Sequence, residues 1–149
     1  MIKFRGKPGK PAERTILYVC VENAGRSQIA EGFFNRKYAP KAYRAISAGT
    51  RPASQINPLA IQGMNEVGID ISSQKSKIIT EDMIKGSEKS VNMGCMDKAE
   101  CRLLFINNVI EWGIEDPKGK PIKKVREIRD EIDKRVKEIA QSLQGQNSS

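Results

Sequence analysis

A short apolar run that stops at a cysteine and leads into a helix is the feature that most constrains this chain. The run TILYVC (Thr15–Cys20) is rich in β-branched and aromatic residues, which predicts a buried strand. From Ser27 to Tyr38 apolar residues recur at helical spacing, and Pro40 ends the pattern. A strand that passes directly into a helix is typical of an α/β protein with a parallel sheet.

The rest of the chain continues this alternation. A second short strand is expected at Tyr43–Gly49, and Asn57-Pro58 opens a helix that stops at Gly68. A third strand is expected at Ser90–Cys95, whereas Cys101–Ile106 is ambiguous between strand and loop. These elements predict a three-layer α/β sandwich with a central, mostly parallel sheet of about four strands and right-handed crossovers.

A long C-terminal helix is the clearest single element. Its apolar residues are spaced by three or four throughout: Ile122, Val125, Ile128, Ile132, Val136, Ile139 and Leu143. Such a stripe faces a hydrophobic core. A coiled-coil partner is the alternative, but packing on the sheet is the commoner outcome.

The length of 149 residues suits one domain, which we place at residues 15–144, with a frayed end at 145–149. Residues 1–14 hold five bases and one acid among Gly and Pro, which predicts a basic flexible tail and accounts for half of the net charge of +8. No cluster of aromatic and basic residues suggests nucleic-acid binding. No secretory signal is seen, and no apolar run approaches the roughly 20 residues that span a bilayer. A cytoplasmic protein without a membrane partner is therefore expected.

The three cysteines are Cys20, Cys95 and Cys101. An odd number without an export signal argues against a structural disulfide framework and favours catalytic or redox thiols. A metal site is not expected, because the chain has no histidine and no C-x-x-C pair. Cys20 and Cys95 both stand at predicted strand ends, where parallel sheets bind their ligands.

The loop VENAG (Val21–Gly25) lies between the first strand and its helix, where successive N–H groups can converge on an anion. Gly25 permits close backbone approach, and Asn23 tolerates a left-handed conformation. Arg26 offers a planar fork to a tetrahedral oxyanion. The predicted oxyanion-binding residues are Val21, Glu22, Asn23, Ala24, Gly25 and Arg26.

The same positive surroundings favour the thiolate of Cys20, with the hydroxyl of Ser27 beside it, so no histidine is required to activate the nucleophile. Displacing oxygen from phosphate or arsenate also requires an acid. Asp116, in the segment EDPKG (Glu115–Gly119), is the candidate, although this segment alone would indicate only a turn.

Four segments carry a resemblance to a known family: VCVENAGRSQIAEGFF, SAGTRPASQINPLAI, VGIDISSQKSK and WGIEDPKG. Together, from about Thr15 to Leu143, they resemble the arsenate reductases of the low-molecular-weight phosphatase superfamily. Cys-x2-Asn-x2-Arg-Ser is shared with the low-molecular-weight tyrosine phosphatases. Those phosphatases usually carry an aromatic residue after the Asp-Pro, whereas Lys118-Gly119 follow here.

The resemblance implies the corresponding fold and a relay of three thiols. Cys20 would attack arsenate, Asp116 would protonate the departing oxygen, and Cys95 would resolve the adduct as a disulfide. Cys101 would carry that disulfide outward, where thioredoxin or a similar dithiol protein reduces it; no bound cofactor is implied. The family often spaces the last two cysteines farther apart and follows the second with proline, whereas Arg102 stands here.

Two enzyme functions therefore compete, and a non-enzymatic oxyanion sensor is a distant third. Arsenate reduction requires all three thiols. Phosphomonoester hydrolysis, as in a low-molecular-weight protein tyrosine phosphatase, requires only Cys20 as a phospho-intermediate, Arg26 and Asp116. The later cysteines and the missing aromatic favour arsenate reduction, with residual phosphatase activity.

Overall fold

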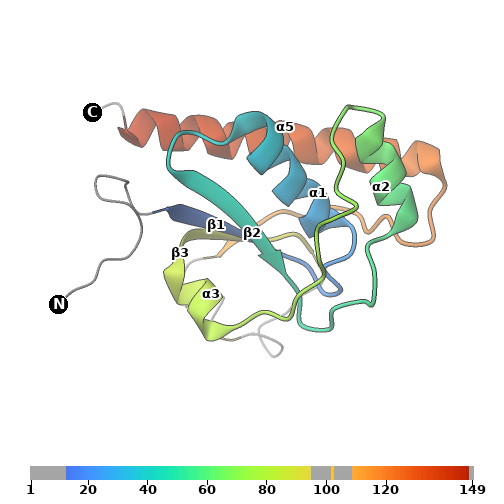
Figure 1. Cartoon of the computed structure of the whole chain (residues 1–149), viewed down its shortest axis with the longest axis horizontal. Helices are drawn as coiled ribbons and strands as arrows, with labels where there is room; N and C mark the ends of the chain where they lie inside the picture. The colour runs from blue at the N-terminus through green and yellow to red at the C-terminus, as the bar shows by residue number, and fades with distance from the viewer. Residues whose placement is uncertain (1–12, 95–101, 103–108, 148–149) are drawn as a thin grey trace.

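The computed structural model describes residues 13–94, Arg102 and residues 109–147. Within these residues a parallel sheet of four strands, in the order β2-β1-β3-β4, lies between two layers of helices (Figure 1). The strands are β1 (Arg14–Val19), β2 (Tyr43–Ala48), β3 (Ser87–Asn92) and β4 (Ile110–Glu111). The helices are α1 (Arg26–Phe33), the π-helix η1 (Phe34–Tyr38), α2 (Pro58–Asn65), α3 (Glu81–Gly86) and α5 (Ile122–Asn147). The predicted fold class is confirmed.

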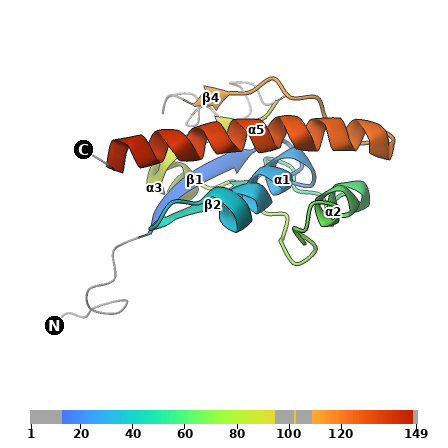
Figure 2. The same ribbon diagram turned by 90° about the horizontal axis from the view of Figure 1, so that it is seen from above.

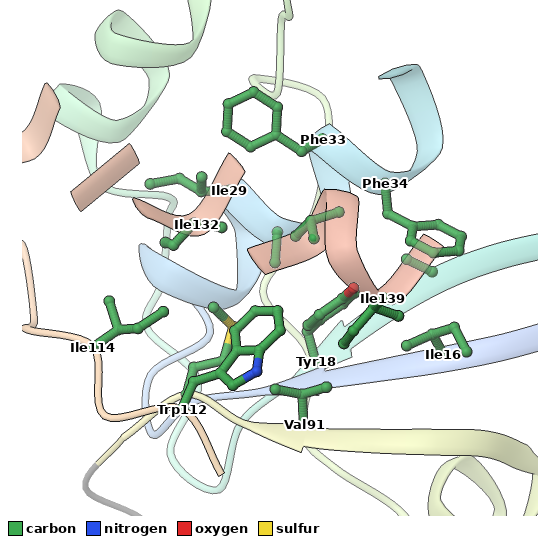
Figure 3. Close-up of a cluster of buried hydrophobic side chains, with 14 of the residues drawn as sticks. Ile16, Tyr18, Ile29, Phe33, Phe34, Val91, Trp112, Ile114, Ile132 and Ile139 are labelled. Atoms are coloured by element: carbon green, nitrogen blue, oxygen red, sulfur yellow. The ribbon is translucent and has the colours of Figure 1, made fainter. Parts of the chain in front are cut away.

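β1 lies at the centre of the sheet and is covered on both faces. Ile16 and Tyr18 point into the main core beneath α1 and α5 (Figure 3), whereas Leu17 and Val19 pack with Ile84 of α3 on the other face. All four β1 side chains are fully buried. A continuous apolar run is what a parallel strand covered on both sides requires.

The helices divide unevenly between the two faces of the sheet. Helices α1, α2 and α5 lie together on one face, and α3 lies on the other (Figures 1 and 2). Six of the seven residues in the predicted apolar stripe of α5 are buried, and Ile122, the first residue of the helix, is half-buried; the six are Val125, Ile128, Ile132, Val136, Ile139 and Leu143. Within the described residues, no helix is both long and apolar enough to cross a membrane.

Most of the predicted elements have slightly different bounds in the structure, and the differences in two of them have a clear cause. The helix expected from Ser27 to Tyr38 becomes α1 followed by the five-residue π-helix η1. The strand expected at Ser90–Cys95 is β3, which starts at Ser87 because it pairs with Thr15, and which ends before Gly94 at φ +132°. Its first three residues are polar and partly exposed, so they give no apolar signal. The Cys101–Ile106 segment lies outside the described residues except for Arg102.

Two elements were not predicted from the sequence. α3 begins after Thr80, whose hydroxyl accepts a hydrogen bond from the N–H of Met83 at 3.1 Å. Two acids, Glu81 and Asp82, complete a typical first helical turn, so a capping signal was present. β4 has only two residues, too few for a periodic pattern.

The packing of α5 on α1 gives a direct test of the core. Ile132 is fully buried in the main cluster, so replacing it with alanine removes packed atoms and leaves a cavity. We expect Ile132→Ala to lower the free energy of unfolding by about 2–5 kcal/mol, measured by urea denaturation. Lys137→Ala, on the exposed side of the same helix, should change it by no more than about 0.5 kcal/mol. Equal effects of the two substitutions would contradict the assigned orientation of α5.

Candidate active site

The loop between β1 and α1 lies at the carboxyl edge of the sheet. Cys20 follows β1 directly, and its N–H donates to the carbonyl of Ala48, the last residue of β2, at 3.3 Å. α1 begins six residues later at Arg26. In parallel sheets this edge is where ligands bind, because the connecting loops converge there.

The carbonyl groups of this loop are held by a neighbouring segment. Val21, Glu22 and Ala24 accept hydrogen bonds, each 2.9 Å long, from the N–H groups of residues 51, 53 and 57 respectively. Within the described part of the chain, no N–H group from Val21 to Arg26 donates to a protein acceptor. These donors are therefore available to an anion, and the binding of an oxyanion by residues 21–26 stays a prediction.

Two residues give the loop its tight shape. Asn23 has φ +50°, a left-handed conformation, and its fully buried side chain accepts from the N–H of Lys77 at 2.8 Å. Gly49 packs against the loop so closely that a Cβ there would lie 2.4 Å from the carbonyl oxygen of Val21. The loop sequence indicated the left-handed conformation of Asn23 but not the role of Gly49, whose signal was a glycine as the last residue of the predicted strand Tyr43–Gly49.

Segment 74–77 supports the same loop from behind. The hydroxyl of Ser76 lies 2.9 Å from the carbonyl oxygens of both Glu22 and Asn23. Gln28 donates to the carbonyl oxygen of Asn23 at 2.9 Å and is itself held by Gln74. The contacts of Ser76 join residues more than 50 positions apart, so no local sequence pattern indicated the role of this segment.

The thiol of Cys20 has a hydroxyl partner. Its Sγ lies 2.9 Å from Oγ of Ser27. The Nδ2 group of Asn23 donates to that same oxygen at 2.7 Å, so Ser27 can direct its own proton to sulfur. The geometry lets the Ser27 hydroxyl donate to the sulfur, and the role of Cys20 as the nucleophile stays a prediction.

Arg26 lines the same pocket as Cys20 and is buried, with only 4% of its side chain exposed. Its Nη1 donates to the carbonyl oxygens of Met93 at 3.1 Å and Ile114 at 2.8 Å. A Cβ on Gly94 would lie 2.3 Å from that nitrogen, so only glycine leaves room for the guanidinium. Fixed on one edge by the two carbonyl groups, the guanidinium can turn its remaining N–H groups to a ligand.

Asp116 reaches the same site from the segment between β4 and α5. One carboxylate oxygen, Oδ2, lies 3.6 Å from Nη2 of Arg26, and Oδ1 accepts from the N–H of Lys118 at 3.0 Å. The next residue, Pro117, packs against Gly25, where a Cβ would lie 3.0 Å from its ring. The candidate acid is thus held by contacts with the loop that it would serve.

A pocket of about 560 Å³ joins these groups. It is lined by Cys20, Val21, Glu22, Ala24, Gly25, Arg26, Ala53, Ser54, Gln55, Ile56, Asn57, Pro58, Asp116, Lys118 and Gly119. The structure therefore brings Cys20, Arg26, Ser27 and Asp116 together as expected from the sequence, since Ser27 contacts the thiol from behind. Their catalytic roles stay predictions.

The other two thiols lie outside the described residues. β3 ends at Asn92, and Met93 and Gly94 run past Arg26 immediately before Cys95. The proposed pairing of Cys95 and Cys101 therefore stays a prediction. Among the described residues, no group of three or more Cys, Asp or Glu side chains could hold a metal ion.

Comparisons with known proteins agree with this geometry. The family described as low molecular weight phosphotyrosine protein phosphatase matches residues 15–149. An arsenate reductase of Brevibacillus brevis is 36% identical over 131 residues, covering 87% of this chain and 96% of that protein. The solved structure of an arsenate reductase in the phosphate binding state superimposes with a TM-score of 0.77 at 30% identity, covering 87% and 98% of the two chains. The solved structure of a thioredoxin-dependent arsenate reductase of Corynebacterium glutamicum superimposes with a TM-score of 0.70 at 34% identity, covering 89% of this chain and 63% of that one. The chain thus belongs to the low-molecular-weight phosphotyrosine protein phosphatase family.

Proposed function

We propose that this protein reduces arsenate to arsenite, with Cys20 as the nucleophile. The observation that carries the proposal is the arrangement of the Cys20 thiol, 2.9 Å from the Ser27 hydroxyl, in a loop of available N–H groups beside the buried Arg26. The similarity to arsenate reductases over most of both chains supports arsenate as the substrate.

The first step is displacement at arsenic. The thiolate of Cys20 forms a sulfur–arsenic bond, one arsenic–oxygen bond breaks, and a protonated Asp116 gives its proton to the departing oxygen, which leaves as water or hydroxide. Arg26 and the loop N–H groups bind the remaining oxygens, where negative charge collects.

The second step reduces arsenic. The thiolate of Cys95 attacks the sulfur of Cys20, the sulfur–arsenic bond breaks, and its electron pair stays on arsenic, which leaves as arsenite. Cys101 then attacks Cys95, which releases the Cys20 thiolate and leaves a Cys95–Cys101 disulfide. An external dithiol of the thioredoxin type supplies two electrons to restore both thiols, a partner suggested by the thioredoxin-dependent relative.

Phosphomonoester hydrolysis is the second candidate, because the family is named for it and Cys20, Arg26 and Asp116 would suffice. In that reaction, water would cleave a Cys20 phospho-intermediate and the other thiols would have no obligatory part. We expect it as a residual activity, since phosphate and arsenate share geometry and charge.

Cys20→Ser tests the common first step. We expect it to abolish both arsenate reduction and aryl phosphate hydrolysis, measured as arsenite release with thioredoxin, thioredoxin reductase and NADPH, and as phenol release. In the unmodified chain, iodoacetamide at pH 6 should label Cys20 first, and added phosphate should slow this labelling. Equal labelling of all three cysteines, unaffected by phosphate, would contradict the assignment.

Asp116→Asn tests the acid. Without a proton to give, the chemical step should slow by about 100-fold or more, measured as kcat. Binding of inorganic phosphate should be unchanged or slightly tighter, because a repulsive carboxylate is gone. Asp82→Asn, exposed on α3, is the matched control and should alter neither value. A parallel loss of binding and rate would mean that Asp116 only positions its loop.

The last two cysteines decide between the two enzyme functions. Cys95→Ser and Cys101→Ser should each stop multiple turnover of arsenate yet leave aryl phosphate hydrolysis largely unchanged. After one turnover, peptide mapping by mass spectrometry should find a Cys20–Cys95 disulfide in Cys101→Ser and a Cys95–Cys101 disulfide in the unmodified chain. If both variants reduce arsenate at the original rate, the relay is wrong and the phosphatase function takes its place.

A further inference from the structure

An ion pair within the pocket has no part in the reaction described above. Nζ of Lys118 lies 2.8 Å from Oε2 of Glu22, and both residues line the pocket. Glu22 belongs to the anion-binding loop, and Lys118 to the turn that carries Asp116. The pair therefore links the two segments that hold the nucleophile and the acid.

The burial of these side chains places the pair on the solvent side. The side chains of Lys118 and Glu22 are 68% and 41% exposed, whereas Cys20 is 3% exposed and the Arg26 side chain 4%. Cys20 and Arg26 thus form the floor of the pocket, and the ion pair lies nearer its mouth, as does Asp116 with 51% of its side chain exposed. Any substituent on a bound oxyanion that points toward solvent must pass this mouth.

The pair is formed by charged groups but is easily opened. Its hydrogen bond to Glu22 raises the pKa of Lys118, so the ammonium form persists. Exposed pairs of this kind contribute only about 0–1 kcal/mol. The N–H of Lys118 stays bonded to Asp116, so opening the pair requires movement of the two side chains only.

The walls of the pocket offer little to an aromatic ester. None of its described lining residues is aromatic, so a phenyl ring entering the mouth finds no stacking partner. It would also enter a pocket whose lining includes the paired side chains of Glu22 and Lys118. A bare tetrahedral anion bound to the loop N–H groups needs no stacking partner and carries no ring past Glu22 and Lys118.

We propose that Glu22 and Lys118 form a specificity gate that favours free inorganic oxyanions over their aryl esters. The proposal rests on the proposed function, in which the loop after β1 is the oxyanion site. The gate discriminates by the group attached to the anion and not by charge, because the pair is neutral as a whole.

The test compares two dianions on the reduced full-length chain. Dissociation constants for inorganic phosphate and for benzylphosphonate are measured by calorimetry at pH 8 for the unmodified chain, Glu22→Gln, Lys118→Gln and the double variant. Lys120→Gln is the matched control, because Lys120 pairs with Glu115 at 3.6 Å and does not line the pocket. Neither measurement requires turnover.

Loss of charge alone should lower the dissociation constants of both ligands in Glu22→Gln, because a negative charge is removed. It should raise both dissociation constants in Lys118→Gln, because a positive charge is removed. The gate predicts more: the ratio of the benzylphosphonate to the phosphate dissociation constant falls in both variants by about two- to fivefold. The double variant should show no larger fall, because either single change already opens the pair. Lys120→Gln should keep the original ratio.

Two outcomes would overturn the gate in different ways. If phosphate binds but the ratio is unchanged in both single variants, the gate is wrong and the proposed function stands. If phosphate does not bind to the reduced unmodified chain, the oxyanion site itself is wrong, and the proposed function falls with the gate.

Discussion

The buried guanidinium of Arg26 is the interaction on which the site depends. Two carbonyl oxygens hold it, one from Met93 after β3 and one from Ile114 after β4. The two carbonyl groups satisfy Nη1 but do not neutralise the charge of the guanidinium, and the carboxylate of Asp116 is 3.6 Å away and half exposed. A buried cation that lines the same pocket as Cys20 favours an oxyanion placed in that pocket. The order of the strands matters because it brings the ends of β1, β3 and β4 to this one side chain.

A chain of fixed donors explains how the site works without histidine. The N–H of Lys77 can only donate, so the atom of Asn23 that faces it is the amide oxygen. The amide nitrogen must then face Ser27 and donate to its hydroxyl oxygen, which leaves the hydroxyl proton for the sulfur of Cys20. The direction of every bond follows from one backbone N–H. The positive φ of Asn23 is the strain that this arrangement requires.

The elements that could be predicted from the sequence are those determined by a local pattern of residues. The strand before Cys20, the helix after it and the stripe of α5 each have a period or a composition that can be read directly. The contacts of Gly49 and Gly94 could not be predicted, because each depends on an approach to a loop or side chain from another strand. The Glu22–Lys118 pair was missed for the same reason: 96 residues separate two surface charges that only the fold brings together.

The charges that line the pocket show where affinity for an anion must come from. Of the described lining residues, Arg26 and Lys118 are basic and Glu22 and Asp116 are acidic, so their charges cancel. The net charge of +8 therefore attracts anions to the protein but does not hold one in the site. The anion must be bound by the N–H groups of residues 21–26 and by Arg26. Arg26 is the only buried side chain among these four charged lining residues. Hydrogen bonds from a partly buried loop are screened less by salt than those at the open surface, but they are lost when the loop changes shape. This is why the buried side chain of Asn23 and the glycine at position 49, which shape the loop, matter as much as the groups that bind the ligand in this scheme.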